Sequence, residues 1–392
     1  MDLTWSPQEE RFRSDVRKWL EENTPEVPFA SGDTAEGFAQ HLEWEKLLYA
    51  NRYSAVSWPT EFGGRAATLW EWLIFEEEYY RAGAPQRVTQ NGIFLLAPTI
   101  FEFGTDRQRE YYLPRMAAAE DLWCQGWSEP NAGSDLAGIT AKAVRDETNG
   151  GWLLSGQKTW TTRGAFCTHL FGLFRTDPES TRHHGLTYLL VPLDAPGVTV
   201  RGFDRLDGDE GFAEVFFDDA FIPDADLDPE RGGVLGGVGQ GWSVAMATTT
   251  SERGLTLRSP GRFQAVAQRL VALAKSAGVD PASSLGERVA RAVMHADAYS
   301  LYTLGDVTGI VEGRSPGARS SLNKIFWSEL DIELHEVALD ILGSTAEHEE
   351  IDGTENAWLK GYQFSLSGPI YAGTNEIQRN IVAERVLGLP RK

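Results

Sequence analysis

The chain contains few cysteines and no long apolar segment. Cys124 and Cys167 are its only cysteines, too few for a disulfide framework, and no Cys/His cluster has the spacing of a metal site. We therefore expect reduced thiols and no bound metal. No stretch is apolar for long enough to cross a bilayer, and the first ten residues lack the basic start and apolar run of a secretion signal. A cytoplasmic protein is the expectation.

Positive charge is also scarce. The chain has 36 Lys and Arg residues against 57 Asp and Glu residues, which gives a formal net charge of −21. Nucleic acids and anionic lipids are bound through cationic side chains, so this balance predicts neither a nucleic acid nor a membrane as partner. An anionic ligand would need local arginines, and Arg253 and Arg258 are the candidates.

What is present is typical of a globular protein with two or three subdomains, because 392 residues exceed the size of one hydrophobic core. Apolar residues recur at helical spacing in the first third of the chain, in residues 8–26, 36–50, 67–82 and 105–119. Short β-rich runs follow at 152–154, 169–174, 186–191 and 214–217. Helical periodicity returns at 242–277, 285–312, 318–343 and 375–387. The predicted order is helices, sheet, helices.

A glycine-rich segment, residues 232–241, separates the predicted sheet from the later helices. It does not match G-x-G-x-x-G, because Trp242 stands where the third glycine would be needed, and it contains no G-K-[ST] phosphate loop. We expect a flexible connector into the next helix.

Four segments carry more specific patterns. Residues 125–138 read QGWSEPNAGSDLAG, a loop of small residues whose N–H groups and hydroxyls can approach a planar ring and a pyrophosphate. Residues 156–162 read GQKTWTT, residues 214–223 read EVFFDDAFIP and residues 371–379 read YAGTNEIQR. Taken singly, the first is also typical of an ordinary turn and the second of a buried strand tryptophan.

Together, in this order, the four segments resemble the signatures of the acyl-CoA dehydrogenase family, nearest to actinobacterial enzymes of the steroid side-chain type, over residues 1–390. The resemblance implies an α+β fold with an N-terminal helical domain (1–121), a central β-barrel-like domain (122–235) and a C-terminal four-helix bundle (236–392). It also implies FAD between the last two domains. The implied reaction is α,β-dehydrogenation of an acyl-CoA thioester to the trans-2-enoyl-CoA, in which a carboxylate removes the α-proton and a hydride leaves the β-carbon for flavin N5.

The resemblance assigns roles to individual residues. The implied FAD contacts are Gln125, Trp127, Ser128, Gly133, Ser134, Trp160, Thr161, Thr162, Thr374 and Glu376. The implied substrate contacts are Ser134, Thr250, Arg253, Ala372 and Gly373. In the family a backbone N–H at the position of Ala372 also donates to the thioester oxygen, where negative charge grows.

The main departure from the family is Ala372, which stands where a catalytic glutamate is expected. A methyl group cannot accept a proton, so an active enzyme needs another carboxylate. Glu252 resembles the position that supplies the base in isovaleryl-CoA and long-chain dehydrogenases. A catalytically inactive scaffold subunit is the alternative, against which the retained Trp160, Thr162 and Glu252 argue. Nitroalkane oxidation on this fold would use an aspartate, which neither base position provides.

A second departure concerns assembly. Residues 282–286 read ASSLG where homotetrameric family members carry an arginine that reaches the neighbour's FAD, and the partner loop at 341–345 is only partly retained. This pattern resembles heterotetramers in which unlike subunits complete one FAD site. A homo-oligomer that uses Arg288 or Arg291 instead is the other expectation. The expected electron acceptor is an electron-transfer flavoprotein or a similar protein.

Overall fold

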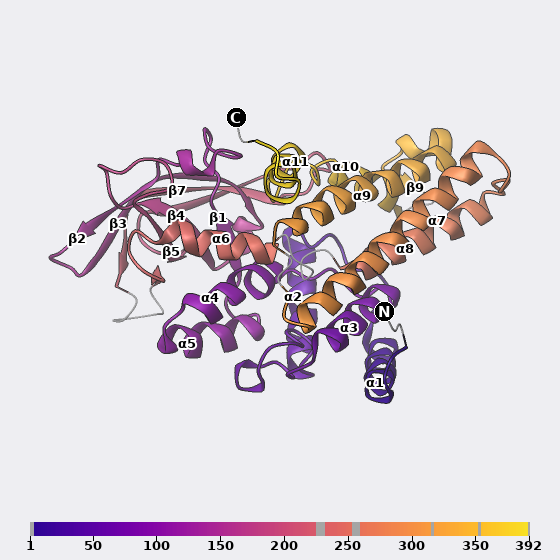
Figure 1. Cartoon of the computed structure of the whole chain (residues 1–392), viewed down its shortest axis with the longest axis horizontal. Helices are drawn as coiled ribbons and strands as arrows, with labels where there is room; N and C mark the ends of the chain where they lie inside the picture. Colours follow the sequence, from indigo (N-terminus) through magenta and orange to yellow (C-terminus); the bar gives the residue numbers. More distant parts are fainter. Residues whose placement is uncertain (1–3, 225–231, 253–258, 315–316, 352–353, 391–392) are drawn as a thin grey trace. The chain divides into compact units, whose positions relative to one another are not determined.

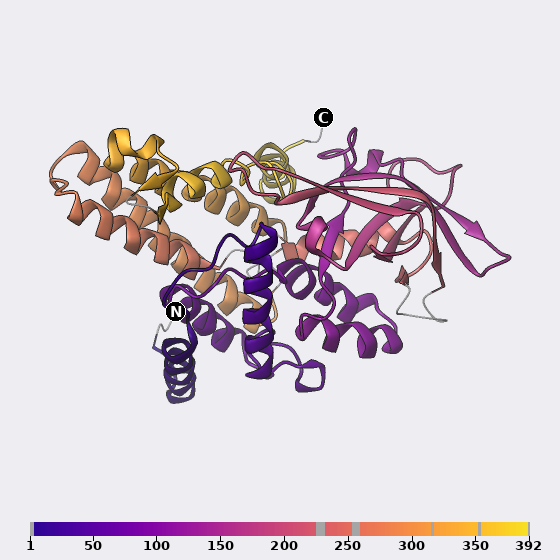
Figure 2. The same cartoon turned by 180° about the vertical axis from the view of Figure 1, so that it is seen from behind.

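A computed structural model describes residues 4–224, 232–252, 259–314, 317–351 and 354–390, with the side chains of residues 250–252 and 354 excepted. Figures 1 and 2 show the chain from two sides, coloured from indigo at the N-terminus to yellow at the C-terminus. The chain divides into two compact units. The sheet unit comprises Val27–Ala67 and Pro85–Glu252, and the bundle unit comprises Met1–Glu26, Thr68–Ala84 and Arg253–Lys392. This division differs from the three expected domains, whose boundaries stay a prediction.

Most strands of the sheet unit belong to one mixed sheet. They are β1 (Trp123–Gly126), β2 (Lys142–Asp146), β3 (Gly151–Thr162), β4 (His169–Arg175), β5 (Leu186–Pro192), β6 (Val198–Phe203), β7 (Phe212–Pro223) and β8 (Gly233–Leu235). The order across the sheet is β6-β7-β3-β2-β4-β5-β8, and β1 pairs in parallel with β4. The long strands β3 and β7 run antiparallel. The predicted runs at 169–174 and 186–191 cover almost all of β4 and β5, whereas those at 152–154 and 214–217 cover only the early parts of the longer β3 and β7.

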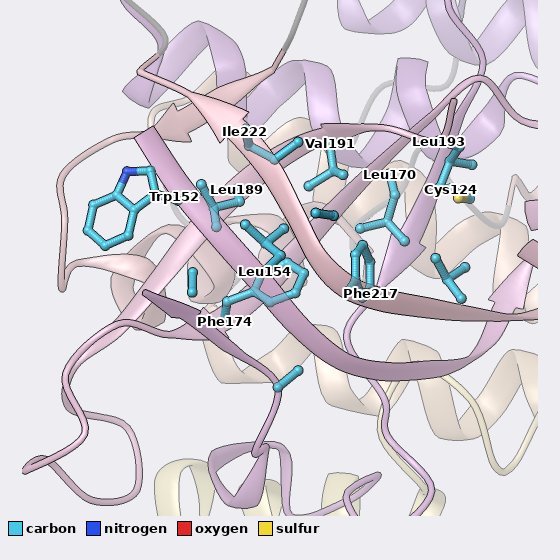
Figure 3. Packing of buried hydrophobic residues seen from close by; sticks show 14 residues of the cluster. Cys124, Trp152, Leu154, Leu170, Phe174, Leu189, Val191, Leu193, Phe217 and Ile222 are labelled. Atoms are coloured by element: carbon cyan, nitrogen blue, oxygen red, sulfur yellow. The ribbon is translucent and has the colours of Figure 1, made fainter. Parts of the chain in front are cut away.

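The sheet's core explains its sequence pattern. Along β7, Ala213, Val215 and Phe217 are buried while the residues between them are not, the alternation expected of a strand with one face in the core. Strands β4 and β5 are buried almost throughout, and helix α6 (Gly241–Glu252) packs on both, which accounts for their continuous apolar runs. Side chains from β3, β4 and β7 meet in one buried cluster (Figure 3).

The remaining helices of the sheet unit are α2 (Ala35–Ala50), α4 (Ala97–Phe103) and α5 (Asp106–Ala117), with single turns at Thr60–Phe62, Asn91–Leu96, Leu136–Gly138 and Gly164–Phe166. Helix α5 starts at a capping box in which Thr105 accepts from the Gln108 N–H and the Gln108 side chain accepts from the Thr105 N–H. Helices α2 and α5 match the predicted ranges. The segment 91–103 was not predicted as helical.

Among its described residues, the bundle unit has helices and one two-strand ribbon, β9 (Glu350–Ile351) and β10 (Thr354–Glu355). Its helices are α1 (Pro7–Asn23), α3 (Leu69–Arg81), α7 (Pro260–Ser276), α8 (Ser284–Val311), α9 (Ser320–Leu342), α10 (Ala357–Ser365) and α11 (Asn375–Ile381). Short turns lie at Gly317–Arg319, Gly343–Glu347 and Val382–Val386. Helix α9 packs against α7, α8 and α10, as Figure 1 shows, around buried Phe263, Leu270, Ala296 and Leu334. The expected α+β fold with a helical bundle is confirmed.

The glycine-rich connector was predicted wrongly in part. Residues Gly233–Leu235 form β8, which pairs antiparallel with β5 through Leu190↔Gly233 and Tyr188↔Leu235. A Cβ on Gly232 would stand 2.2 Å from the Leu190 carbonyl oxygen. This glycine therefore allows two backbone segments to approach closely, and does not serve as a flexible link. None of the described helices is long and apolar enough to span a membrane.

Candidate active site

A bulge in β3 shapes the first candidate surface. In the pairing with β7, Lys158 faces Val215 and Thr161 faces Ala213, so β3 has one residue more than β7 over this stretch. Trp160 lies inside the bulge with a φ of +57° and is 61% exposed. Its ring meets Phe203 and Phe212 edge to face, at centroid distances of 5.3 and 5.5 Å. The bulge thus holds a large aromatic side chain at the surface, where it can stack on a planar ligand.

The end of β3 is fixed by a buried ionic network. Arg163, which follows Thr162, has a φ of +55°, and its Nε donates to Asp33 Oδ1 at 2.6 Å. Arg205 Nη1 donates to the other oxygen of Asp33, also at 2.6 Å. Burial alone would raise the pKa of Asp33, but the two guanidinium groups hold it below its ordinary value. The network fixes the backbone immediately after Thr161 and Thr162.

Strand β1 and the loop that follows it carry polar groups of two kinds. Gln125 Nε2 and Trp127 Nε1 are buried and have no hydrogen-bond partner in the described part of the chain, and the same holds for Thr161 Oγ1 on β3. Gly133 and Ser134, further along the loop, are exposed, and a Cβ added to Gly133 would meet no atom within 4 Å. Ser128 is half-buried, and its carbonyl accepts from the Thr159 N–H at 2.9 Å.

A buried ion pair joins this loop to β3. Lys158 Nζ donates to Glu129 Oε1 at 2.8 Å and to the Leu173 carbonyl at 2.7 Å. Glu129 also accepts from the Thr140 and Ala141 N–H groups. Burial lowers the pKa of Lys158 to about 8 against the opposing effect of Glu129, while the pKa of Glu129 falls below its ordinary value because Lys158 and the N–H donors outweigh burial.

Sequence reasoning missed this pair. Lys158 lies in the predicted GQKTWTT strand, and a lysine within a strand of the core sheet was the available signal, but nothing in the sequence pointed to a partner at Glu129.

The C-terminal motif lies in the bundle unit, at the start of α11. Ala372 and Gly373 are consecutive left-handed residues, with φ of +57° and +78°. Thr374 is the N-cap, and its hydroxyl accepts from the Ile377 N–H at 3.2 Å. Glu376 is exposed, and hydrogen bonds from its own N–H and from the Thr374 hydroxyl lower its pKa.

Two buried side chains hold the ends of this motif. Asn375 Oδ1 accepts from Lys324 Nζ at 2.8 Å and from Ser328 Oγ at 3.2 Å, both on α9. Gln378 Nε2 donates to the carbonyls of Ala372 and Gly373. The turn is therefore fixed from both sides.

The predicted base falls outside the described side chains. The backbone of Thr250 and Glu252 lies in the last turn of α6, but their side chains, and the whole of Arg253 and Arg258, lie outside the described residues. Glu252 as base, and Thr250 and Arg253 as substrate contacts, stay predictions.

The segment that lacks the family arginine starts α8. Ser283 is the N-cap and accepts from the Gly286 N–H at 3.1 Å. Arg288 forms an ion pair with Asp340, and Arg291 Nε lies 3.3 Å from Glu333 Oε1, both on α9. The two arginines proposed as substitutes already have acidic partners within the bundle unit.

The site residues of the sheet unit fit a polar planar group. Two buried N–H donors, a buried hydroxyl and an exposed indole come from two adjoining segments, β1 with its loop and β3. A flavin ring presents acceptors along its edge and an aromatic face, which are the features these groups complement.

Comparison with known proteins identifies the family. Three domain families match the chain: "Acyl-CoA dehydrogenase, N-terminal domain" at residues 6–120, "Acyl-CoA dehydrogenase, middle domain" at 124–220 and "Acyl-CoA dehydrogenase, C-terminal domain" at 239–387. The chain belongs to the acyl-CoA dehydrogenase family.

Relatives and solved structures agree. The acyl-CoA dehydrogenase IpdE1 of Mycolicibacterium smegmatis is 40% identical over 98% of both chains, and IpdE1 of Mycobacterium tuberculosis is 41% identical over 98% of both. Among solved structures, the Tcur3481-Tcur3483 steroid ACAD has 25% identity and a TM-score of 0.87 over 100% of both chains. The ChsE4-ChsE5 complex from Mycobacterium tuberculosis has 27% identity and a TM-score of 0.84 over the same share.

These similarities confirm the predicted family, its likeness to the actinobacterial steroid type, and an oxidoreductase of the acyl-CoA dehydrogenase kind. Membership in this family implies a flavin cofactor.

Proposed function

We propose that the chain is an FAD-dependent acyl-CoA dehydrogenase that converts an acyl-CoA to the trans-2-enoyl-CoA. The observation that carries the proposal is the bulge in β3, which exposes Trp160 next to Thr161 and Thr162. A structural tryptophan would be buried, whereas this one is held at the surface in a left-handed conformation that L-residues seldom adopt. Strain of this kind is typical of a ligand site.

The proposed division of labour follows from the chemistry. A bound flavin supplies the acceptor for the hydride from the β-carbon. Glu252 takes the α-proton, and the Ala372 N–H donates to the thioester oxygen as charge grows there. The proposed FAD contacts are Gln125, Trp127, Ser128, Gly133, Ser134, Trp160, Thr161, Thr162, Thr374 and Glu376. The proposed acyl-CoA contacts are Ser134, Thr250, Arg253, Ala372 and Gly373.

The names of the relatives support a substrate class and an assembly. One similar solved structure is titled a steroid ACAD, so we propose a bulky, ring-bearing acyl group as the favoured substrate. Another is titled as the ChsE4-ChsE5 complex, so we propose a homologous partner subunit as the favoured assembly. A homo-oligomer is the other arrangement. An electron-transfer flavoprotein or a similar protein is the proposed acceptor. Nucleic acid and membrane are not proposed as partners, and cytoplasmic location stays a prediction.

An inactive scaffold subunit is the second candidate, because Ala372 removes the usual base. The flavin content of the chain purified alone is the first discriminator: a flavin-bearing chain that acyl-CoA bleaches is an active subunit. In a complex with a homologous subunit the partner's site also carries flavin, so there the effect of a variant at Glu252 decides.

The direct test is Glu252→Gln in the flavin-bearing preparation. The amide keeps the shape of the side chain but cannot accept a proton, so flavin reduction by acyl-CoA should slow by at least about a thousandfold. Flavin content and acyl-CoA affinity should remain. Glu336→Gln, at an exposed glutamate on α9, is the matched control and should reduce at the wild-type rate. Wild-type reduction by the Glu252 variant would refute the assignment of the base.

A further inference from the structure

Gln378, on helix α11, is a polar residue that is fully buried. Its residue exposure is 0%, and its Nε2 donates to the Ala372 carbonyl at 3.1 Å and to the Gly373 carbonyl at 3.2 Å. Its Oε1 is also buried and has no donor within the described part of the chain. The amide orientation is unambiguous, because the opposite one would place Oε1 against two carbonyl oxygens. A buried amide with one unsatisfied end is costly, so a role in packing alone does not explain it.

The two carbonyls belong to a turn with an unusual backbone. Ala372 and Gly373 both have a positive φ, and alanine seldom adopts that conformation without external support. A peptide N–H points away from the carbonyl of the same peptide group. By holding the carbonyls of Ala372 and Gly373, Gln378 therefore turns the N–H groups of Gly373 and Thr374 to the opposite side.

The N–H groups of this turn are available to a ligand. Those of Ala372, Gly373 and Thr374 have no acceptor among the residues that the structure describes, although the neighbouring Tyr371 and Asn375 N–H groups donate to Ser367 and Pro369. The turn thus presents three successive N–H groups without an acceptor, while two of its carbonyls accept from the buried Gln378 amide. Such a row of donors suits an oxyanion.

We infer that Gln378 is a positioning residue: it fixes the turn at residues 372–374 and holds the N–H donors of Gly373 and Thr374, beside that of Ala372, toward the thioester oxygen of the acyl-CoA. The inference rests on the proposed function and deepens it. Gln378 does not touch the substrate. It fixes the turn before charge develops on the oxygen, so its contribution should appear mainly in the transition state. The Asn375 bonds to Lys324 and Ser328 hold the other end of the same turn.

The first test replaces Gln378 with methionine in the flavin-bearing enzyme. Methionine keeps much of the volume but cannot donate, so the turn loses its support. Flavin reduction at saturating acyl-CoA should slow by roughly 10- to 100-fold, less than the cost of deleting an oxyanion donor outright. Acyl-CoA affinity and flavin content should change by less than about threefold. Asn380→Met, at an exposed position close by on α11, should behave as the wild type.

A spectroscopic readout separates positioning from folding. The bound enoyl-CoA product, labelled with ¹³C at the thioester carbon, should show a carbonyl stretching band at lower frequency than in solution for the wild type. In Gln378→Met most of that lowering should disappear. An unchanged band together with an unchanged rate would overturn the inference. A wild-type enzyme that no acyl-CoA reduces would instead refute the proposed function, and this inference with it.

A second variant, Gln378→Glu, guards against a methionine variant that does not fold. A carboxylate cannot donate to the two carbonyls, but a protonated carboxyl group can donate to one of them. Burial and the carbonyls both favour the protonated form. The reduction rate of this variant should therefore rise relative to the wild type as the pH falls from about 8 to about 6. A rate ratio that does not depend on pH would contradict the role assigned to the donor.

Discussion

Each of the two candidate ligand segments is held by a buried lysine, but the two lysines have different partners. In the sheet unit, Lys158 is 0% exposed and forms an ion pair with Glu129, which lies in the loop that follows β1. In the bundle unit, Lys324 is also 0% exposed, and its Nζ donates to the amide oxygen of Asn375 at the start of α11. The first contact is an ion pair and the second a charge-assisted hydrogen bond.

The difference matters for what a substitution leaves behind. Removing one member of a buried ion pair strands an uncompensated charge, whereas removing the donor from a neutral amide strands only an unsatisfied oxygen. Asn375 Oδ1 retains the Ser328 hydroxyl as a second donor, and Glu129 would keep three hydrogen bonds from Thr140 and Ala141, but these neutral donors do not replace the charge of Lys158. The sheet segment should therefore be the more sensitive of the two.

The largest expected effect is at the ion pair. Lys158→Met should lower the free energy of unfolding of the flavin-free protein by roughly 3–5 kcal/mol, because Glu129 is left buried and charged. Adding Glu129→Gln should recover part of the loss. Urea unfolding measures both, and Lys142→Met, at an exposed lysine on β2, is the control. A double variant no more stable than the single one would show that the stranded charge is not the cause.

Lys324→Met should cost less, about 1–3 kcal/mol, since the partner of its hydrogen bond is a neutral amide oxygen; its contact with the Trp327 ring is lost as well. The same urea experiment measures it, and Lys275→Met at an exposed position on α7 is the matched control. A loss equal to or larger than that of Lys158→Met would reverse the comparison between the two segments.

Sequence reasoning predicted the elements of the fold that depend on local sequence pattern. The helical spacing of α2, α5, α8 and α9 is local, so these helices were predicted nearly in place, while of β7 only the run 214–217 was predicted. The pairing of Gly233–Leu235 with β5 was missed because glycines there serve a close backbone contact that no periodicity reports.

At the candidate site, too, sequence reasoning did not predict contacts between residues far apart in the chain. The motif segments were recognised, but the partners that hold them were not: Glu129 is 29 residues from Lys158, and Asn375 is 51 residues from Lys324. Such pairs are set by the tertiary fold. The left-handed conformations of Trp160 and Ala372 were likewise beyond prediction, because neither residue type favours a positive φ.

The last expected effect is a pH dependence carried by Lys158. Its pKa is lowered from 10.5 to about 8 in the folded protein because burial disfavours the charged form. Between these two values the unfolded chain binds more protons at this residue than the folded chain does, so the contribution of Lys158 to stability rises with pH across that window. The free energy of unfolding of the wild type should therefore increase with pH relative to that of Lys158→Met from about pH 8 to about pH 10.5. Parallel curves for the two proteins would mean that Glu129 keeps Lys158 charged throughout, and that the ion pair outweighs burial in the sheet unit.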